Sequence, residues 1–193
     1  MNKEKSLIAL LFFLVFTAPM RSQKAGEITK DEQSTFGTEE VPGIPLVKRP
    51  LPVPDAALPI LNEDVDVKGC LSDNPLPPGH SLASWFIGSE IHLDGPSEND
   101  LVVVPLPDNE CFHSVAGIGT FWVFRRVGEQ YELVLKALGN GLTILGAKHN
   151  GYRSIQTGTA GQAGRQFTTV VFRFHGKRYR EYRKETKEKG EKP

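Results

Sequence analysis

The chain has 193 residues, of which 39% are hydrophobic and 24% charged, and its 23 basic residues balance its 23 acidic residues. A formal net charge of zero lacks the basic excess that is typical of nucleic-acid-binding proteins, so no nucleic-acid partner is expected. Beyond the N-terminal segment, no apolar run is long enough to cross a membrane.

The N-terminus has the pattern of a secretory signal peptide. Lys3 and Lys5 supply a positive start, and residues 7–16 form an unbroken apolar run. This run is shorter than the roughly 20 residues that a bilayer-spanning helix needs, and it fits the apolar region of a cleaved signal. We expect cleavage after Ser22 and a secreted or periplasmic product, with an uncleaved membrane anchor as the alternative. Removing residues 1–22 leaves 20 basic and 22 acidic residues, a net charge of −2.

Two segments are expected to be disordered. Residues 23–60 begin with a polar, charged stretch and continue as PGIPLVKRPLPVPDAALP over 42–59, which favours extended polyproline-type chain. We interpret this linker as a spacer from the membrane or wall, and a Pro-rich docking peptide is the alternative. The tail over 184–193 contains no apolar residue to bury, so it is expected to stay solvated.

Residues 61–183 are expected to form one all-β domain. Apolar and polar residues alternate through much of this region; the odd-numbered residues of 131–137 are all apolar and are predicted to share one face of a strand. Residues 121–124 are apolar on both faces, so their strand is predicted to be central. The predicted strands cover 84–93, 100–107, 120–127, 131–138, 142–149, 152–159, 166–174 and 177–183.

The connections between these strands carry turn signals. Asn150-Gly151 is a strong two-residue hairpin signal, and His175-Gly176 marks a last tight turn. Strands joined by short turns are antiparallel neighbours, because a parallel crossover needs about a dozen residues. The predicted fold is therefore an antiparallel meander of about eight strands, either like a propeller blade or a small sandwich. A short turn around 60–69 is the only helical candidate.

Cys70 and Cys111 are the only cysteines. An even count in an exported chain predicts a disulfide, because the compartment is oxidising; a reactive thiol and a metal ligand are the alternatives. In a meander, the loop before the first strand and the loop after the second can lie at the same end of the sheet. The two cysteines can therefore approach closely enough to bond. A thiol enzyme pairing Cys111 with His113 is less favoured than a structural cystine.

Several segments resemble known sequences. HLDGPSENDLVVV (92–104) resembles a degenerate FG-GAP-type loop, in which Asp-x-Asn-x-Asp-Gly-x-x-Asp precedes a strand of integrin-α-like β-propeller repeats. Residues 121–157 and 170–180 are similar to small uncharacterised exported bacterial β-proteins that carry such a loop. The resemblance covers about residues 68–182. It implies an all-β fold and export, and it implies no activity.

A calcium site in this loop would need six to eight oxygen ligands. The ligand positions of the FG-GAP-type pattern fall on His92, Asp94, Pro96 and Asp100, of which only the two aspartates are carboxylates. The other interpretation is that the aspartates build a turn through bonds to nearby backbone amides. We therefore expect no resident cofactor, and we keep His92, Asp94 and Asp100 as candidate calcium ligands.

Residues 173–184 interleave six basic residues with three aromatic residues around a tight turn. Arginine binds phosphate and carboxylate groups through two parallel hydrogen bonds, and aromatic faces stack on guanidinium groups or sugars. Arg173, Lys177, Arg178 and Arg180 are therefore candidates for binding an anionic envelope polymer. The alternative is an edge hairpin whose charge protects it from aggregation.

Sequence signatures of catalysis are weak. The chain has no Gly-x-Ser-x-Gly elbow, no paired zinc-ligand spacing and no Gly-rich phosphate loop between a strand and a helix. The favoured hypothesis is an exported, non-catalytic β-domain that acts in binding or envelope structure, with an anionic polymer or an exported protein as partner. A metal-assisted hydrolase using His92, Asp94 and His113 is one alternative, and an inhibitor of a wall-cleaving enzyme is another.

Overall fold

The computed structural model describes residues 34–38, 46–95, 99–112, 117–161 and 164–188. The strands in these residues are β1 (Ser34–Gly37), β2 (Pro50–Leu51), β3 (Phe86–Ile91), β4 (Asp100–Pro105), β5 (Gly119–Val127), β6 (Gln130–Gly139), β7 (Gly141–His149), β8 (Tyr152–Gly161), β9 (Gln166–His175) and β10 (Arg178–Glu188). The helices are α1 (Leu58–Asn62) and α2 (Val65–Asp73), with short 3-10 turns η2 (Leu82–Trp85) and η3 (Glu110–Phe112). The expected signal peptide lies outside the described residues.

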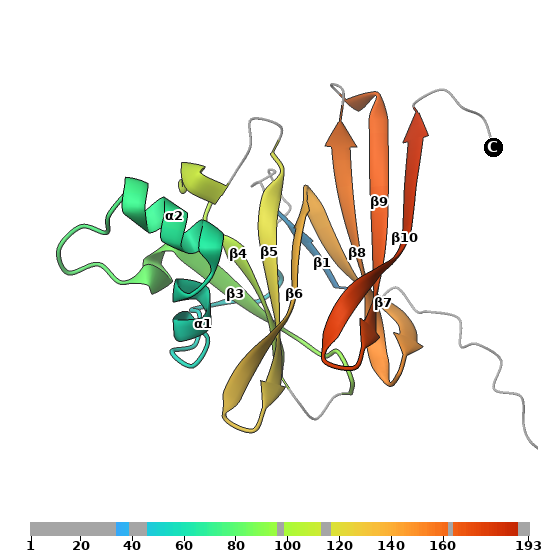
Figure 1. The fold of residues 1–193 in the computed structure, drawn as a ribbon, viewed down its shortest axis with the longest axis horizontal. Helices are drawn as coiled ribbons and strands as arrows, with labels where there is room; N and C mark the ends of the chain where they lie inside the picture. The colour runs from blue at the N-terminus through green and yellow to red at the C-terminus, as the bar shows by residue number, and fades with distance from the viewer. Residues whose placement is uncertain (1–33, 39–45, 96–98, 113–116, 162–163, 189–193) are drawn as a thin grey trace, which may run out of the picture.

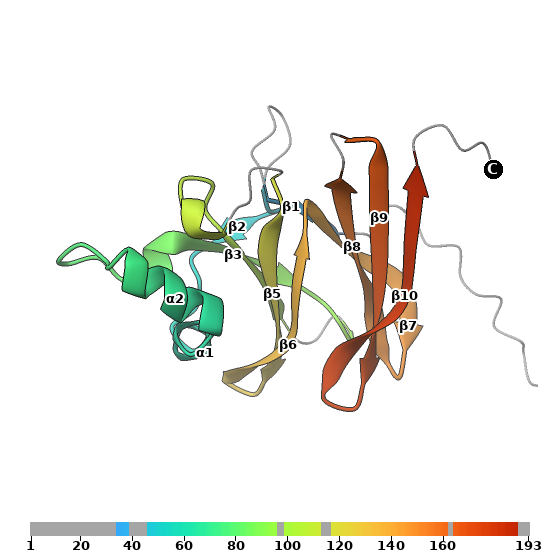
Figure 2. The same ribbon diagram turned by 45° about the horizontal axis from the view of Figure 1, so that its top comes forward.

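The strands form two antiparallel sheets of five strands each, in the orders β1-β7-β8-β9-β10 and β2-β3-β4-β5-β6. Figures 1 and 2 show three layers: the helices, the sheet that contains β5, and the sheet that contains β9. The chain is therefore an all-β antiparallel sandwich with a helical cover on one outer face. Within the described residues, no helix is long and apolar enough to span a membrane.

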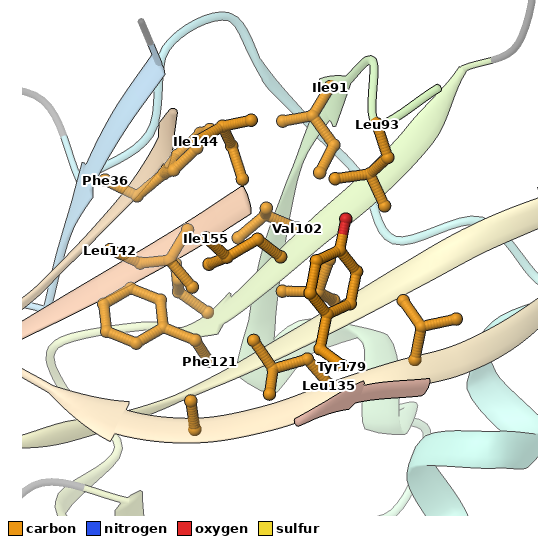
Figure 3. Close-up of a cluster of buried hydrophobic side chains, with 14 of the residues drawn as sticks. Phe36, Ile91, Leu93, Val102, Phe121, Leu135, Leu142, Ile144, Ile155 and Tyr179 are labelled. Carbon is orange, nitrogen blue, oxygen red and sulfur yellow. The ribbon is translucent and has the colours of Figure 1, made fainter. Parts of the chain in front are cut away.

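The all-apolar segment of β5 explains why the β5 sheet is covered on both sides. Phe121 and Val123 belong to the core between the two sheets, whereas Trp122 and Phe124 belong to the core beneath the helices. β5 is hydrogen-bonded to β4 on one side and β6 on the other, which confirms the prediction that it lies inside a sheet. Figure 3 shows side chains from both sheets converging on the first of these cores.

A β-bulge corrects the prediction that residues 131, 133, 135 and 137 share one face. Val123 pairs with Leu135 but the next residue of β5 pairs with Leu133, so Val134 is an extra residue in β6. Leu135 and Ala137 consequently face the core between the sheets, while Tyr131 and Leu133 pack in the core beneath the helices. A single extra residue exchanges the faces of everything that follows it.

The expectation of a disordered linker over 23–60 is wrong for the part that the structure describes. β1 pairs with β7 and places Phe36 opposite Leu142, and β2 pairs with β3. Phe36, Val47 and Val53 are buried, so the few apolar residues of this segment fill gaps in both cores. These residues are too sparse to give a periodic pattern, which is why the sequence resembled a spacer.

The expectation of a disordered tail from residue 184 is also wrong as far as residue 188. β10 continues to Glu188, which pairs with Gln166 of β9. Backbone pairing with β9 holds this end of the strand although its side chains are polar. The helical segment was underestimated too, because the turn expected around 60–69 is two helices and Cys70 lies in α2 rather than in a loop.

Turn chemistry places most hairpins as predicted. Asn150 and Gly151 both adopt positive φ, 52° and 84°, and join β7 to β8. The last turn lies one residue later than predicted, since His175 pairs with Arg178 and Gly176 adopts the positive φ of 69° that its turn requires. This register shift decides which basic residues face one another.

Candidate functional site

The described residues of the loop that was predicted to resemble an FG-GAP-type loop lie at the end of β3 and at the start of β4. Asp100 is fully buried, and its two carboxylate oxygens accept hydrogen bonds from the backbone amides of Leu93, at 2.8 Å, and Arg126, at 2.9 Å. Asp94 lies in the loop, where its backbone carbonyl accepts a bond from Lys148. Asp100 thus ties the start of the loop to β5.

The residues proposed for a metal-assisted hydrolase, His92, Asp94 and His113, are only partly placed. His92 is half-buried beside the loop, and His113 lies outside the described residues. Pro96, a position of the calcium-loop pattern, also lies outside them. In the part of the chain that the structure describes, no three His, Cys, Asp or Glu side chains gather so that they could hold a metal ion. Calcium binding and metal-assisted hydrolysis stay predictions.

The disulfide prediction is confirmed. Cys70 and Cys111 are bonded, with 5.8 Å between their Cα atoms, and they join α2 to η3. Both cysteines of the chain are used. Such a bond is typical of an oxidising, extracytoplasmic location.

A pocket of about 510 Å³ opens beside this bond, and we call it the disulfide pocket. The described residues that line it are Asn74, Ser84, Trp85, Asp108, Asn109 and Cys111. Asn74 ends α2, Trp85 precedes β3, and Asp108 and Asn109 precede η3. The disulfide therefore joins two of the three segments that line the pocket, the end of α2 and the turn that contains η3.

Contacts within the disulfide pocket fix its side chains. The Asn109 side-chain oxygen accepts a hydrogen bond from the Cys111 amide at 3.3 Å, and the Asn74 amide nitrogen lies 3.3 Å from the Cys111 sulfur. The Trp85 ring meets the buried Phe112 ring edge to face, with 6.1 Å between centroids. The pocket is thus preformed by covalent and packing constraints.

The β9–β10 hairpin gathers basic residues on one face, and we call Arg173, His175, Arg178 and Arg180 the basic block. Arg173 lies directly opposite Arg180, and His175 directly opposite Arg178. Phe174 sits between these pairs and is buried in the core, so the basic block faces the other side of the sheet. His175, Arg178 and Arg180 are exposed, and Arg173 is half-buried.

The scaffold beneath the basic block is closely packed. Tyr179 is buried opposite Phe174, with 5.3 Å between ring centroids, and its hydroxyl donates to the Arg153 carbonyl at 2.7 Å. Burial raises the pKa of Tyr179, so the phenol keeps the proton it donates. On the outer face, the Arg173 guanidinium carbon lies 3.3 Å from the centroid of the Tyr182 ring. This stacking holds one arginine of the block in place.

The charge of the basic block is not compensated within the described part of the chain. No carboxylate there forms a salt bridge with Arg173, Arg178 or Arg180, although Arg183 further along β10 pairs with Glu185 at 3.4 Å. These three arginines therefore lack a carboxylate partner among the described residues, although Arg173 stacks on Tyr182.

Lys136 on β6 provides the contrast. Its ammonium contacts the carboxylates of Asp64 and Asp66, each at 2.7 Å. Burial alone would raise the pKa of Asp64, but hydrogen bonding and attraction from Lys136 lower it overall. Burial alone would lower the pKa of Lys136, and its bonds to the two aspartates raise it overall. Here the fold neutralises its own cation, as it does not do at the basic block.

Sequence reasoning named three members of the basic block, Arg173, Arg178 and Arg180, together with Lys177 of the turn. It missed His175, because the turn was placed on that residue. It also missed the disulfide pocket, whose residues come from three segments and share no spacing in the sequence. The only sequence feature that pointed to the pocket was Asn109, which lies two residues before a cysteine predicted to form a disulfide.

Comparisons with known protein families, curated proteins and solved structures found no match to this chain. They give no test of the resemblance to FG-GAP-type proteins, which stays a prediction.

Proposed function

We propose that this protein is an exported, non-catalytic binding domain, and that the basic block on the β9–β10 hairpin binds an anionic polymer of the cell envelope. The observation that carries the proposal is the direct opposition of Arg173 and Arg180 without a carboxylate between them. Export is supported by the confirmed disulfide and by the predicted signal peptide.

Opposed like charges are unfavourable in a sheet. Side chains of a directly opposed pair have Cβ atoms about 5 Å apart, and a like-charged pair destabilises the sheet, whereas an opposite pair stabilises it. A phosphate or carboxylate placed over Arg173 and Arg180 converts this repulsion into charge-assisted hydrogen bonds. His175 and Arg178 form the adjacent pair on the same face, so a chain with repeated anionic groups meets two successive basic pairs.

The protective-edge alternative makes a different prediction. β10 is an edge strand, and charge along its whole length would discourage edge-to-edge pairing. Protection depends on how many charges the strand carries, whereas polymer binding depends on which residues carry them. Two double variants with equal loss of charge therefore separate the two hypotheses.

The test is retention of the full chain on phosphocellulose as a function of salt. Arg178→Ser with Arg180→Ser removes two cations from the basic block, and Arg183→Ser with Lys187→Ser removes two from the other end of β10. We expect the first variant to elute at clearly lower salt and its salt dependence to weaken by about one unit of slope for each lost contact. The second variant is expected to elute close to the native protein. Equal losses in both variants would show that net charge alone is responsible and would refute the proposal.

A further inference from the structure

We infer that the disulfide pocket is a second, separate binding site, and that it takes an uncharged sugar residue stacked on Trp85. Its volume of about 510 Å³ falls within the range of roughly 300–1,000 Å³ that is usual for small-ligand sites. The inference does not depend on the basic block, which lies on the other sheet.

The chemistry of the lining favours a polyhydroxylated ligand. Asn74, Ser84, Asp108 and Asn109 present amide, hydroxyl and carboxylate groups that can exchange hydrogen bonds with ligand hydroxyls. None of the described lining residues is basic, and Asp108 is the only charged one among them. An anionic ligand would therefore be repelled here, in contrast to the basic block.

Trp85 supplies the apolar surface that such a ligand also needs. A sugar ring has C–H groups on its faces and hydroxyls around its rim, so it stacks on an indole while its rim binds polar side chains. Trp85 is half-buried, and its ring packs edge to face against the ring of Phe112. The backbone carbonyl of Trp85 accepts a hydrogen bond from the Leu106 amide at 2.9 Å. Because the aromatic platform is already fixed, little conformational entropy is lost on binding.

The disulfide aligns the polar groups with this platform. The Cys111 sulfur accepts a contact from the Asn74 side-chain amide, and the Cys111 backbone amide donates to the Asn109 side-chain oxygen. The Asn74 backbone amide donates to the Cys70 carbonyl at 2.8 Å at the C-terminal end of α2. The carboxamides on opposite sides of the bond are thereby held at fixed positions. Preorganised polar groups beside an aromatic ring are what distinguish a binding site from an incidental surface hollow.

The test is tryptophan fluorescence of the full chain titrated with neutral tetrasaccharides: cellotetraose, maltotetraose and chitotetraose. The chain has two tryptophans, and Trp122 is fully buried, so a ligand-dependent change reports on Trp85. We expect a saturable change with at least one of the three. Failure of all three to change the emission would overturn the inference.

Variants locate the binding that is seen. For Trp85→Ala, binding of the active tetrasaccharide measured by calorimetry is expected to weaken at least tenfold, and for Asp108→Ala severalfold. Trp85→Phe keeps an aromatic face and should stay within a fewfold of the native protein. Phe167→Ala, a change at an exposed aromatic residue of β9, is the matched control and should bind normally. Native affinity in both Trp85→Ala and Asp108→Ala would place the sugar elsewhere and refute the assignment. Unchanged phosphocellulose retention of Trp85→Ala keeps this result separate from the test of the basic block.

Discussion

Replacing Asp100 with alanine is expected to destabilise the protein strongly, although Asp100 belongs to a loop with a calcium-like sequence. The carboxylate is fully buried and accepts bonds from the Leu93 and Arg126 amides, at 2.8 and 2.9 Å. Alanine leaves both amide donors without this acceptor, and a buried donor that loses its partner costs about 1–3 kcal/mol. Since the Arg126 bond is only part-buried, we expect a total loss of roughly 3 kcal/mol.

Asp100→Asn refines this prediction. The amide keeps one acceptor oxygen but turns an NH₂ group toward one of the two backbone amides, so one bond is lost and the other is kept. We expect about half the loss of the alanine variant, roughly 1.5 kcal/mol. A loss of either size is a large share of a total stability of about 5–15 kcal/mol.

Urea unfolding of the full chain, followed by circular dichroism with and without calcium, measures both variants. Asp55→Ala, at an exposed turn position, is the control and should change the free energy of unfolding by less than about 0.5 kcal/mol. If Asp100→Ala has the same free energy of unfolding as this control, the hydrogen bonds from the carboxylate to the Leu93 and Arg126 amides do not stabilise the protein. If calcium stabilises the native protein and this gain disappears in Asp100→Ala, the side chain is a metal ligand and the structural account is wrong.

Three further predictions concern stability. The folded pKa of Asp64 is lowered below its ordinary 3.8, so its ion pair with Lys136 stabilises the protein above that pH and the gain is lost as the pH falls through the folded pKa. The pKa of Lys136 is raised above 10.5, so its contribution is present below that pH and is lost as the pH rises through the folded value. Asp64→Ala should flatten the acid limb of the stability curve and only reduce the alkaline limb, because Asp66 still pairs with Lys136. Unfolding without reductant should expose no titratable thiol, and two free thiols in freshly exported protein would contradict the disulfide. Cys70→Ser with Cys111→Ser should lower the free energy of unfolding by up to about 4 kcal/mol, the value that the chain-entropy model gives for a sequence separation of 41. Tyr179→Phe removes a hydrogen bond to a β8 carbonyl and should cost about 1 kcal/mol in thermal unfolding, and no change would show that the bond is not formed.

The strands of the sandwich were predictable because local signals specify them. Asn150-Gly151, Gly128 and Gly176 mark turns that adopt positive φ, and the alternation between turns predicts the faces of the strands except where the bulge in β6 exchanges them. All eight predicted strands are present as β3 to β10. The strands and turns of residues 84–183 could therefore be predicted from the sequence without knowledge of tertiary contacts.

What the sequence did not show depends on partners distant in the chain. β1 has four residues and is a strand because β7 offers it an edge, and β2 contains Pro50, which an edge strand tolerates. α2 contains Val65 and Gly69, which are poor helix formers. Its readable signal was Asp64, whose carboxylate caps the helix by accepting bonds from two backbone amides.

The candidate site was half predictable for the same reason. The basic residues of the hairpin were visible in the sequence, but the opposition of Arg173 and Arg180 follows from the register, which a one-residue shift of the turn changes. The bulge at Val134 shows that one extra residue is enough to change the register. The disulfide pocket needs the helix, the strand entrance and the turn to be assembled before its residues meet.

The most direct test of the proposed function is an amide chemical-shift titration of the isotope-labelled full chain with polyphosphate of defined length. We predict that the largest shifts fall within residues 173–182, that they saturate, and that they vanish in Arg178→Ser with Arg180→Ser while persisting in Arg183→Ser with Lys187→Ser. Shifts spread evenly over all basic residues, or centred outside the β9–β10 hairpin, would contradict the claim that the basic block is a binding site.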